Sequence, residues 1–71
     1  MKISVFTKPG CQPCRMTKKF LSEHDIAFEE VDGLAHIDEL REEGFAQFPI
    51  IKTETDSWSG FRPDKLKALV K

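Results

Sequence analysis

Apolar and polar positions alternate along residues 2–6, and this predicts a β-strand with Ile3 and Val5 on one face. Residues 7–10 interrupt the pattern with a Pro-Gly turn. Apolar positions then recur four residues apart, which predicts a helix from the first cysteine to about residue 23. The residues expected to form its buried stripe are Met16, Thr17, Phe20 and Leu21.

The middle of the chain carries a second strand and a second helix. Residues 27–31 alternate well enough for a strand, and Asp32 after it is a residue type that caps helices. The helix is expected to continue to about residue 43, where Gly44 suits the position that ends it. Its expected inner positions are Leu34, Ile37 and Leu40.

The last third of the chain predicts a hairpin and a final helix. Residues 49–53 predict a third strand with proline at its first position, and residues 57–59 a short fourth strand. Pro63 and Asp64 suit the first turn of a helix, because proline needs no partner there and an acid complements the helix dipole. The apolar face of this helix is expected to contain Leu66, Leu69 and Val70.

The elements follow one another as β-α-β-α-β-β-α. A strand–helix–strand unit implies a right-handed crossover and parallel pairing, whereas the later hairpin adds antiparallel strands. We therefore expect an α/β protein with residues 1–71 in a single domain. Its expected architecture is a thioredoxin-like fold, with a four-stranded mixed sheet and three helices that cover both faces.

The net charge of −1 hides a strong segregation of charge along the chain. Residues 1–19 contain five basic residues and no acid, whereas residues 20–43 contain nine acids and a single arginine. The basic cluster is small and the whole chain is not basic, so nucleic-acid binding is not expected. No apolar run approaches the roughly 18 residues of a membrane span, and residue 1 leads directly into a strand. We expect a cytoplasmic protein without a membrane segment.

Only two cysteines are present, Cys11 and Cys14, and a bridge between them closes a loop too short to stabilise the fold much. Two cysteines separated by two residues, at the start of a helix that follows a strand, are instead typical of a redox-active pair. The helix N-terminus favours the thiolate of Cys11, which predicts that Cys11 attacks a disulfide and Cys14 resolves the mixed disulfide. The alternative is a metal site shared between two chains, with His24 or His36 as further ligands. Both histidines stand among charged residues, so we expect them on the surface and expect no bound metal.

Two further segments are candidates for the site. Pro49 follows Phe48 at the start of the third strand, where thioredoxin-like folds carry a cis proline that faces the cysteines. We expect a cis bond here, which leaves the backbone of Phe48 free to pair with an extended client. Trp58 and Phe61 fit equally well as core aromatics or as an exposed docking surface for a partner.

These motifs together resemble the NrdH-redoxin family. The resemblance is carried by Val5-Phe6-Thr7-Lys8-Pro9-Gly10-Cys11-x-x-Cys14, by Phe48-Pro49 and by Trp58-Ser59-Gly60-Phe61-Arg62-Pro63-Asp64. It implies a monomeric dithiol–disulfide oxidoreductase with no bound cofactor. Its electrons would come from NADPH through thioredoxin reductase and would pass to the class Ib ribonucleotide reductase.

The resemblance also assigns roles to residues. The active-site loop around the redox pair comprises Lys8, Pro9, Gly10, Gln12, Pro13 and Arg15. The expected partner-binding residues are Phe48, Pro49, Trp58, Ser59, Gly60, Phe61 and Arg62. We expect the segment from Trp58 to Asp64 to close the place where glutaredoxins hold glutathione and to present Trp58 for docking.

The chain departs from the family pattern at two places. The dipeptide Gln12-Pro13 replaces the more usual apolar residue followed by glutamine, and Ser57 stands where many members carry histidine. The main alternative is a glutathione-dependent glutaredoxin. The Gly-Gly and acidic pair with which ordinary glutaredoxins bind the tripeptide is absent, which disfavours it.

Overall fold

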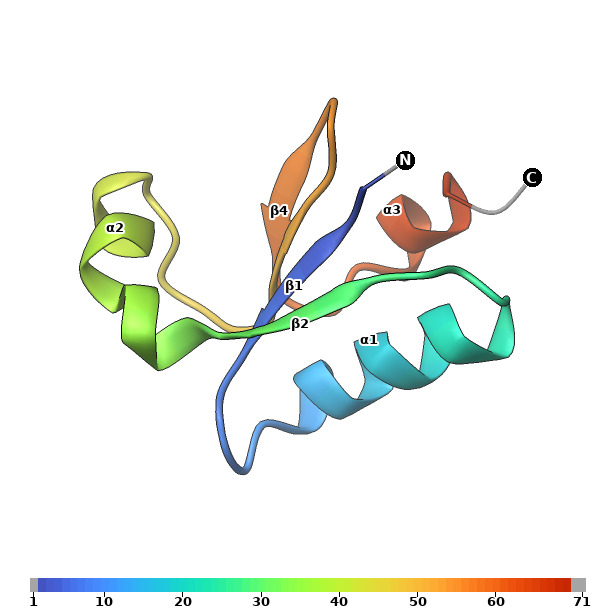
Figure 1. The fold of residues 1–71 in the computed structure, drawn as a ribbon, viewed down its shortest axis with the longest axis horizontal. Coiled ribbons are helices and arrows are strands. Elements are labelled where there is room, and N and C mark those ends of the chain that lie inside the picture. The colour runs from blue at the N-terminus through green and yellow to red at the C-terminus, as the bar shows by residue number, and fades with distance from the viewer. Residues whose placement is uncertain (1, 70–71) are drawn as a thin grey trace.

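The computed structural model describes residues 2–69 and contains the predicted elements in the predicted order (Figure 1). The strands are β1 (Ser4–Thr7), β2 (Glu29–Asp32), β3 (Ile50–Lys52) and β4 (Ser57–Ser59). The helices are α1 (Gln12–Glu23), α2 (Ile37–Glu42) and α3 (Pro63–Lys67), with a 3₁₀ turn η1 (Gly33–His36) directly before α2.

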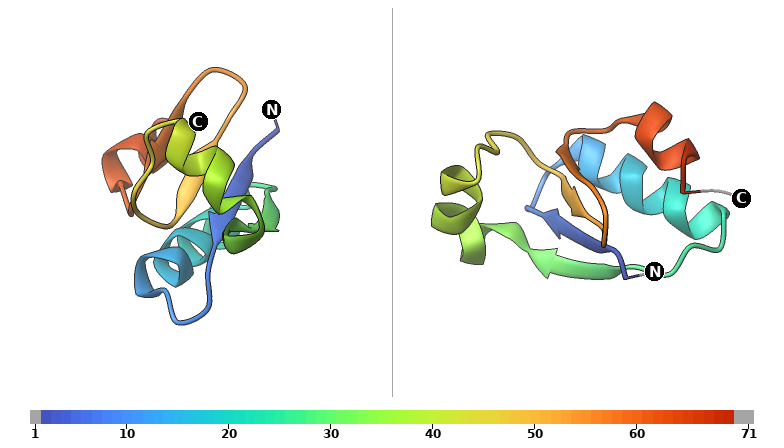
Figure 2. Two further views of the ribbon diagram at one scale, coloured as in Figure 1. Left: turned by 90° about the vertical axis from the view of Figure 1, so that its left-hand side faces the viewer. Right: turned by 90° about the horizontal axis from the view of Figure 1, so that it is seen from above.

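The four strands form one mixed sheet in the order β2-β1-β3-β4. β1 pairs with β2 in parallel, and the two antiparallel pairs are β1 with β3 and β3 with β4. α1 and α3 lie against one face of the sheet, and α2 lies on the opposite side (Figure 2). The expected mixed sheet with helices on both faces is confirmed.

The main core lies between the sheet and the helices α1 and α3. Val5, Ile51 and Trp58 stand opposite one another across β1, β3 and β4, so they form one apolar row on this face. Leu21 from α1 and Leu66 from α3 are both fully buried against that row. This packing fixes the position of α1, and therefore of the cysteines at its N-terminus.

Asp32 and Gly44 lie at the two ends of the segment formed by η1 and α2. The backbone N–H of Leu34 donates to the carboxylate of Asp32 at 3.1 Å, so Asp32 caps the turn η1. Gly44 has φ +94°, and the N–H groups of Gly44 and Phe45 return to the last carbonyls of α2 at 3.0 Å each. A residue with a side chain would be strained at this φ, which explains the glycine.

Two residues expected in the core are exposed instead. Met16 is 52% exposed, because α1 buries only the face that carries Cys14, Thr17 and Leu21. Leu34 is 49% exposed, because it lies in the 3₁₀ turn, whose tighter winding places it on a different face from Leu40. Leu66 and Leu69 pack on the core as expected, and Val70 lies outside the described residues.

Within residues 2–69, no helix is both long and apolar enough to cross a membrane.

Candidate active site

The attacking cysteine candidate sits at the start of α1. Cys11 is the N-cap residue, and Gly10 before it has φ +71°, which lets the chain turn from β1 into the helix. The sulfur of Cys11 accepts a hydrogen bond from the backbone N–H of Cys14 at 3.2 Å. A thiolate at this atom would accept the same hydrogen bond and would lie at the positive end of the helix dipole, and both interactions stabilise its negative charge.

The two sulfurs are bonded to each other, with their Cα atoms 5.2 Å apart. Both residues are buried, but Cys14 is the more enclosed, at 1% exposed against 6% for Cys11. Cys11 borders two surface hollows and Cys14 only one of them. A client therefore has more ways to approach Cys11 than Cys14.

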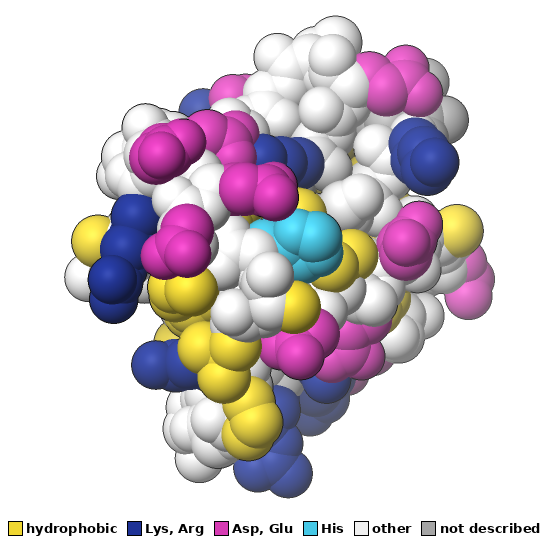
Figure 3. Space-filling model, turned by 60° about the vertical axis from the view of Figure 1, so that its left-hand side comes forward, with side chains coloured by type: hydrophobic (Ala, Val, Ile, Leu, Met, Phe, Trp, Pro, Cys, Tyr) yellow, Lys and Arg dark blue, Asp and Glu magenta, His cyan; other side chains and the backbone are white. Residues whose placement is uncertain are grey.

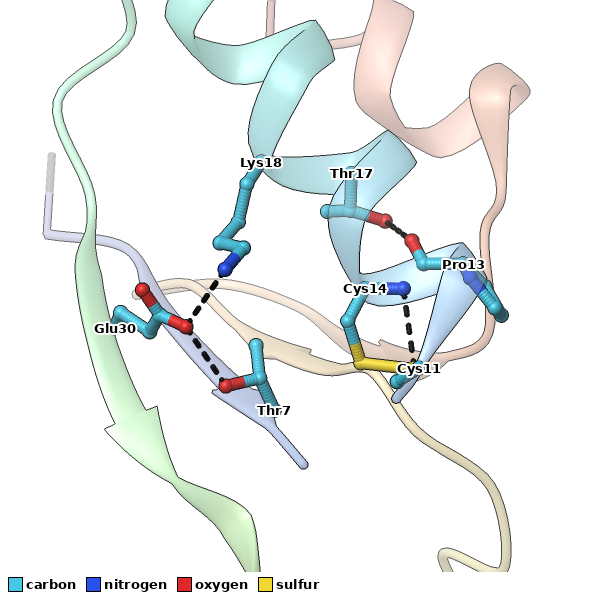
Figure 4. Close-up of a disulfide and its surroundings, with 7 residues drawn as sticks. All are labelled: Thr7, Cys11, Pro13, Cys14, Thr17, Lys18 and Glu30. Carbon is cyan, nitrogen blue, oxygen red and sulfur yellow. Dashed lines mark hydrogen bonds and ion pairs between the residues drawn. A yellow bond between two sulfur atoms is a disulfide. The ribbon is translucent and has the colours of Figure 1, made fainter. Parts of the chain in front are cut away.

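The first turn of α1 is held from inside the protein. The hydroxyl of Thr17 donates to the carbonyl of Pro13 at 2.9 Å, and Thr17 is completely buried (Figure 4). Pro13 itself is exposed and lies in the first turn, where its missing N–H removes no helix bond. The redox pair thus rests on a turn that is fixed on its inner side.

A polar cluster beside the disulfide was missed by the sequence analysis. Glu30 on β2 accepts hydrogen bonds from the hydroxyl of Thr7 and from the ammonium of Lys18, both at 2.9 Å (Figure 4). The bond from Lys18, then that from Thr7, lowers the pKa of the Glu30 carboxyl. The alternation of side chains along the strands could have indicated this cluster, once the strands are paired. Glu30 stands opposite Val5, and Thr7 lies two residues after Val5, so both side chains lie on the face of the sheet that α1 covers.

This cluster forms one side of the larger hollow at the disulfide, which has a volume of about 590 Å³. The residues that line it are Thr7, Lys8, Pro9, Gly10, Cys11, Cys14, Arg15, Lys18, Glu30 and Asp32. The hollow therefore joins cations of the β1–α1 loop and of α1 to the acids of β2.

The second hollow, of about 480 Å³, lies between the cysteine loop and the segment before β3. The Phe48–Pro49 bond is cis, as expected, and Pro49 is buried while Phe48 is half-buried. Phe48 packs against Gly33, where a Cβ atom would overlap its ring, and the ammonium of Lys8 lies 5.8 Å from its ring centre. The lining residues are Lys8, Gly10, Cys11, Gln12, Pro13, Ala46, Gln47 and Phe48.

The structure separates the predicted partner-binding residues into a buried and an exposed group. Trp58 is only 6% exposed and belongs to the main core, so the expected exposed docking indole is not found. Its burial follows from its place opposite Ile51 on the face covered by α3. Phe61 also packs against the core, Ser59 and Gly60 are half-buried, and Arg62 is exposed.

Arg62 and Asp64 form an ion pair at the start of α3, with two contacts of 3.3 Å each. Hydrogen bonds from Arg62 hold the pKa of the Asp64 carboxyl below its usual value. The first turn of α3 thus already carries a carboxylate from the protein itself.

The two histidines do not meet the cysteines. His24 is exposed at the end of α1, where it stacks on Phe20, and His36 packs edge-on against Phe6. Among residues 2–69, no three histidine, cysteine, aspartate or glutamate side chains gather closely enough to hold a metal ion.

Comparison with known proteins identifies the chain at the level of its family. A family model described as Glutaredoxin matches residues 3–55. The glutaredoxin-like protein NrdH of Lactococcus lactis is 39% identical over 94% of this chain and 97% of its own length. The NrdH protein of Escherichia coli is 38% identical over 97% of this chain and 89% of its own. This chain belongs to the NrdH redoxins.

Solved structures agree with this assignment. The NrdH-redoxin of Escherichia coli superposes with a TM-score of 0.93 at 32% identity, covering 100% of this chain and 97% of its own. A thioredoxin-like protein, BC3987, superposes with a TM-score of 0.80 at 30% identity, covering 96% and 99%. The fold of this redoxin is therefore thioredoxin-like. With its CxxC pair, Cys11 and Cys14, it is a thiol–disulfide oxidoreductase.

Proposed function

We propose that this redoxin is the electron donor of a class Ib ribonucleotide reductase and is itself reduced by thioredoxin reductase with NADPH. It works as a cytoplasmic monomer with a single domain over residues 1–71 and without a bound cofactor. The observation that carries the proposal is the place of Cys11, at the N-cap of α1 between two hollows, with Cys14 bonded to it one turn on.

The chemistry needs only the two cysteines. The Cys11 thiolate forms a bond to one sulfur of the client disulfide, and the other client sulfur leaves as a thiolate. The Cys14 thiol, after losing its proton, then attacks the sulfur of Cys11 and releases the second client sulfur. Two electrons have passed to the client, and the Cys11–Cys14 disulfide seen here remains.

The route of the electrons is supported by the relatives and by the surface around the site. The curated relatives are named NrdH, and the Escherichia coli structure is described as having a thioredoxin-like activity profile. The first turn of α3 carries Asp64, whose carboxylate pairs with Arg62, so the Arg62 cation already has a partner within the protein. The segment Phe48–Pro49 beside Cys11 offers an extended client peptide a neighbouring backbone.

A coupled assay tests this route. NADPH consumption with thioredoxin reductase, this redoxin and a disulfide client should be fast, and the same mixture with glutathione and its reductase should be slow. Equal rates would replace the proposal with a glutathione-dependent glutaredoxin. Metal that co-purifies with Cys11 and Cys14 between two chains would replace it with a metal-bridged dimer.

Trapping tests the roles of the cysteines separately. The Cys14→Ser variant should retain a client as a stable mixed disulfide on Cys11, because the resolving thiol is missing. The matched Cys11→Ser variant should retain none. Stable trapping by Cys11→Ser alone would reverse the two roles.

A further inference from the structure

The three cations that line the larger hollow differ in whether they form an ion pair within the protein. Lys8, Arg15 and Lys18 all line the larger hollow at the disulfide. Lys18 forms an ion pair with Glu30, with its ammonium 2.9 Å from the carboxylate. Lys8 and Arg15 are exposed and have no ion-pair partner among residues 2–69.

These two unpaired cations both line the larger hollow at Cys11, and Lys8 also lines the smaller one. Lys8 lies on the Phe48 side, where its ammonium is 5.8 Å from the phenyl ring centre and contributes to both hollows. Arg15 lies one helical turn beyond Cys11, and its backbone N–H donates to the Cys11 carbonyl at 3.3 Å. A segment that brings a sulfur to Cys11 through the larger hollow therefore meets two unpaired positive charges.

The acids that line the larger hollow belong to β2. Figure 3 shows basic side chains at the lower end of the molecule, where the β1–α1 loop lies, whereas the acidic side chains and other basic ones lie above them. Glu30 and Asp32 both already have partners within the protein, because Glu30 pairs with Lys18 and Asp32 accepts a hydrogen bond from the backbone N–H of Leu34. A basic segment is repelled at Cys11 by Lys8 and Arg15, whereas an acidic one is attracted there.

We propose that the partner segment presented to Cys11 is acidic: an extended, cysteine-bearing peptide with aspartate or glutamate on both sides of its reactive sulfur. One carboxylate pairs with Lys8 on the Phe48 side, and the other pairs with Arg15 on the α1 side. The proposal rests on the proposed redox function, since the segment carries the disulfide that the redoxin reduces. Exposed charges of this kind mainly raise the rate of encounter, and they do so in a salt-dependent way.

The test uses three synthetic peptides that contain the same intramolecular disulfide. They differ only in the residues that flank the two cysteines. The flanks are glutamate, glutamine or lysine at matched positions, and the rate constant of reduction by the pre-reduced redoxin is measured for each. At about 20 mM NaCl we expect the glutamate peptide to react about 10-fold faster than the lysine peptide. At about 300 mM the Debye length falls to about 6 Å, and the ratio should approach one.

Two variants of the redoxin test whether Lys8 and Arg15 cause the preference for the glutamate peptide. Lys8→Gln and Arg15→Gln should each lower the ratio of glutamate to glutamine rates by about 2- to 5-fold. Using this ratio cancels any change in the reactivity of the Cys11 thiolate, because that change affects both peptides equally. Lys67→Gln is the matched control, since Lys67 is exposed on α3 and lines neither hollow at the disulfide.

The outcomes separate this proposal from the redox function. Equal rates for the three peptides, or a preference for lysine, would overturn the acidic partner and leave the redox function intact. A loss of preference in Lys67→Gln as large as in Lys8→Gln would also overturn it, because net charge alone would then explain the effect. Failure to reduce any peptide would refute the proposed function itself.

Discussion

Replacing Trp58 with alanine removes the only tryptophan of the chain from the main core. A tryptophan buries about 150–250 Å². At about 25 cal/mol per Å², the loss amounts to about 4–6 kcal/mol, close to the 3–5 kcal/mol typical of such truncations. A chain of 71 residues has a total stability of about 4–11 kcal/mol. We therefore expect Trp58→Ala to lose between about a third and all of the free energy of unfolding.

Trp58→Phe separates loss of packing from loss of the indole itself. The buried Nε1 atom of Trp58 has no hydrogen-bond partner among the described residues. Phenylalanine removes this unpaired donor while it keeps an aromatic ring, so the two effects offset each other in part. We expect a cost of about 0–2 kcal/mol, well below that of the alanine variant.

Urea titration of the oxidised proteins measures both costs. Far-ultraviolet circular dichroism is the suitable signal, because both variants lack the tryptophan whose fluorescence would otherwise report unfolding. An alanine variant that loses less than about 1 kcal/mol would contradict the burial of Trp58 in the core. A stable Trp58→Phe variant that loses more than about 10-fold in its rate with thioredoxin reductase would show that the indole contacts the reductase directly.

Three further changes test local features of the fold. Asp25 follows α1 with φ +55°, so Asp25→Gly should relieve backbone strain and raise the free energy of unfolding by about 0.5–1 kcal/mol; an unchanged urea midpoint would contradict this. Lys18 lowers the pKa of Glu30, so the pair stabilises the fold above the ordinary value of 4.5 and loses this contribution as the pH falls through the lowered pKa. Glu30→Gln should therefore cost about 0.2–1 kcal/mol at pH about 7, and this cost should shrink as the pH falls through the lowered pKa of Glu30; a cost that does not change with pH would refute the role of the charge. Gly33→Ala should displace the ring of Phe48, lower stability by about 1–3 kcal/mol and slow client reduction; full activity at wild-type stability would contradict the contact.

The features that the sequence predicted well are those decided by a few neighbouring residues. Asp32 caps η1 and Gly44 ends α2 as expected, because both act through backbone groups within a few positions of themselves. The place of Cys11 at the N-cap of α1 follows in the same way from the Pro-Gly turn before it. Local signals were thus sufficient to place the redox pair.

Features set by contacts between distant segments were predicted less well. The first strand was expected over residues 2–6 and the second over 27–31, but they run over Ser4–Thr7 and Glu29–Asp32. Their ends are fixed by the pairing of the two strands with each other, which no local pattern records. The contact of Glu30 with Lys18 has the same origin, since it joins β2 to α1 across the sheet edge.

The segment from Trp58 to Asp64 carried the resemblance most specifically, yet its aromatic residues serve mainly the interior. Gly60 connects this segment to the site, because its backbone N–H donates a hydrogen bond to the carbonyl of Pro49 at 2.8 Å. Ser59 pairs with Ile50 directly after that proline, so β4 holds the start of β3 in place. Trp58 anchors the same strand in the core. This segment of the family signature therefore fixes the position of Phe48 and Pro49 beside Cys11, and we expect partner contact at the residues that line the two hollows.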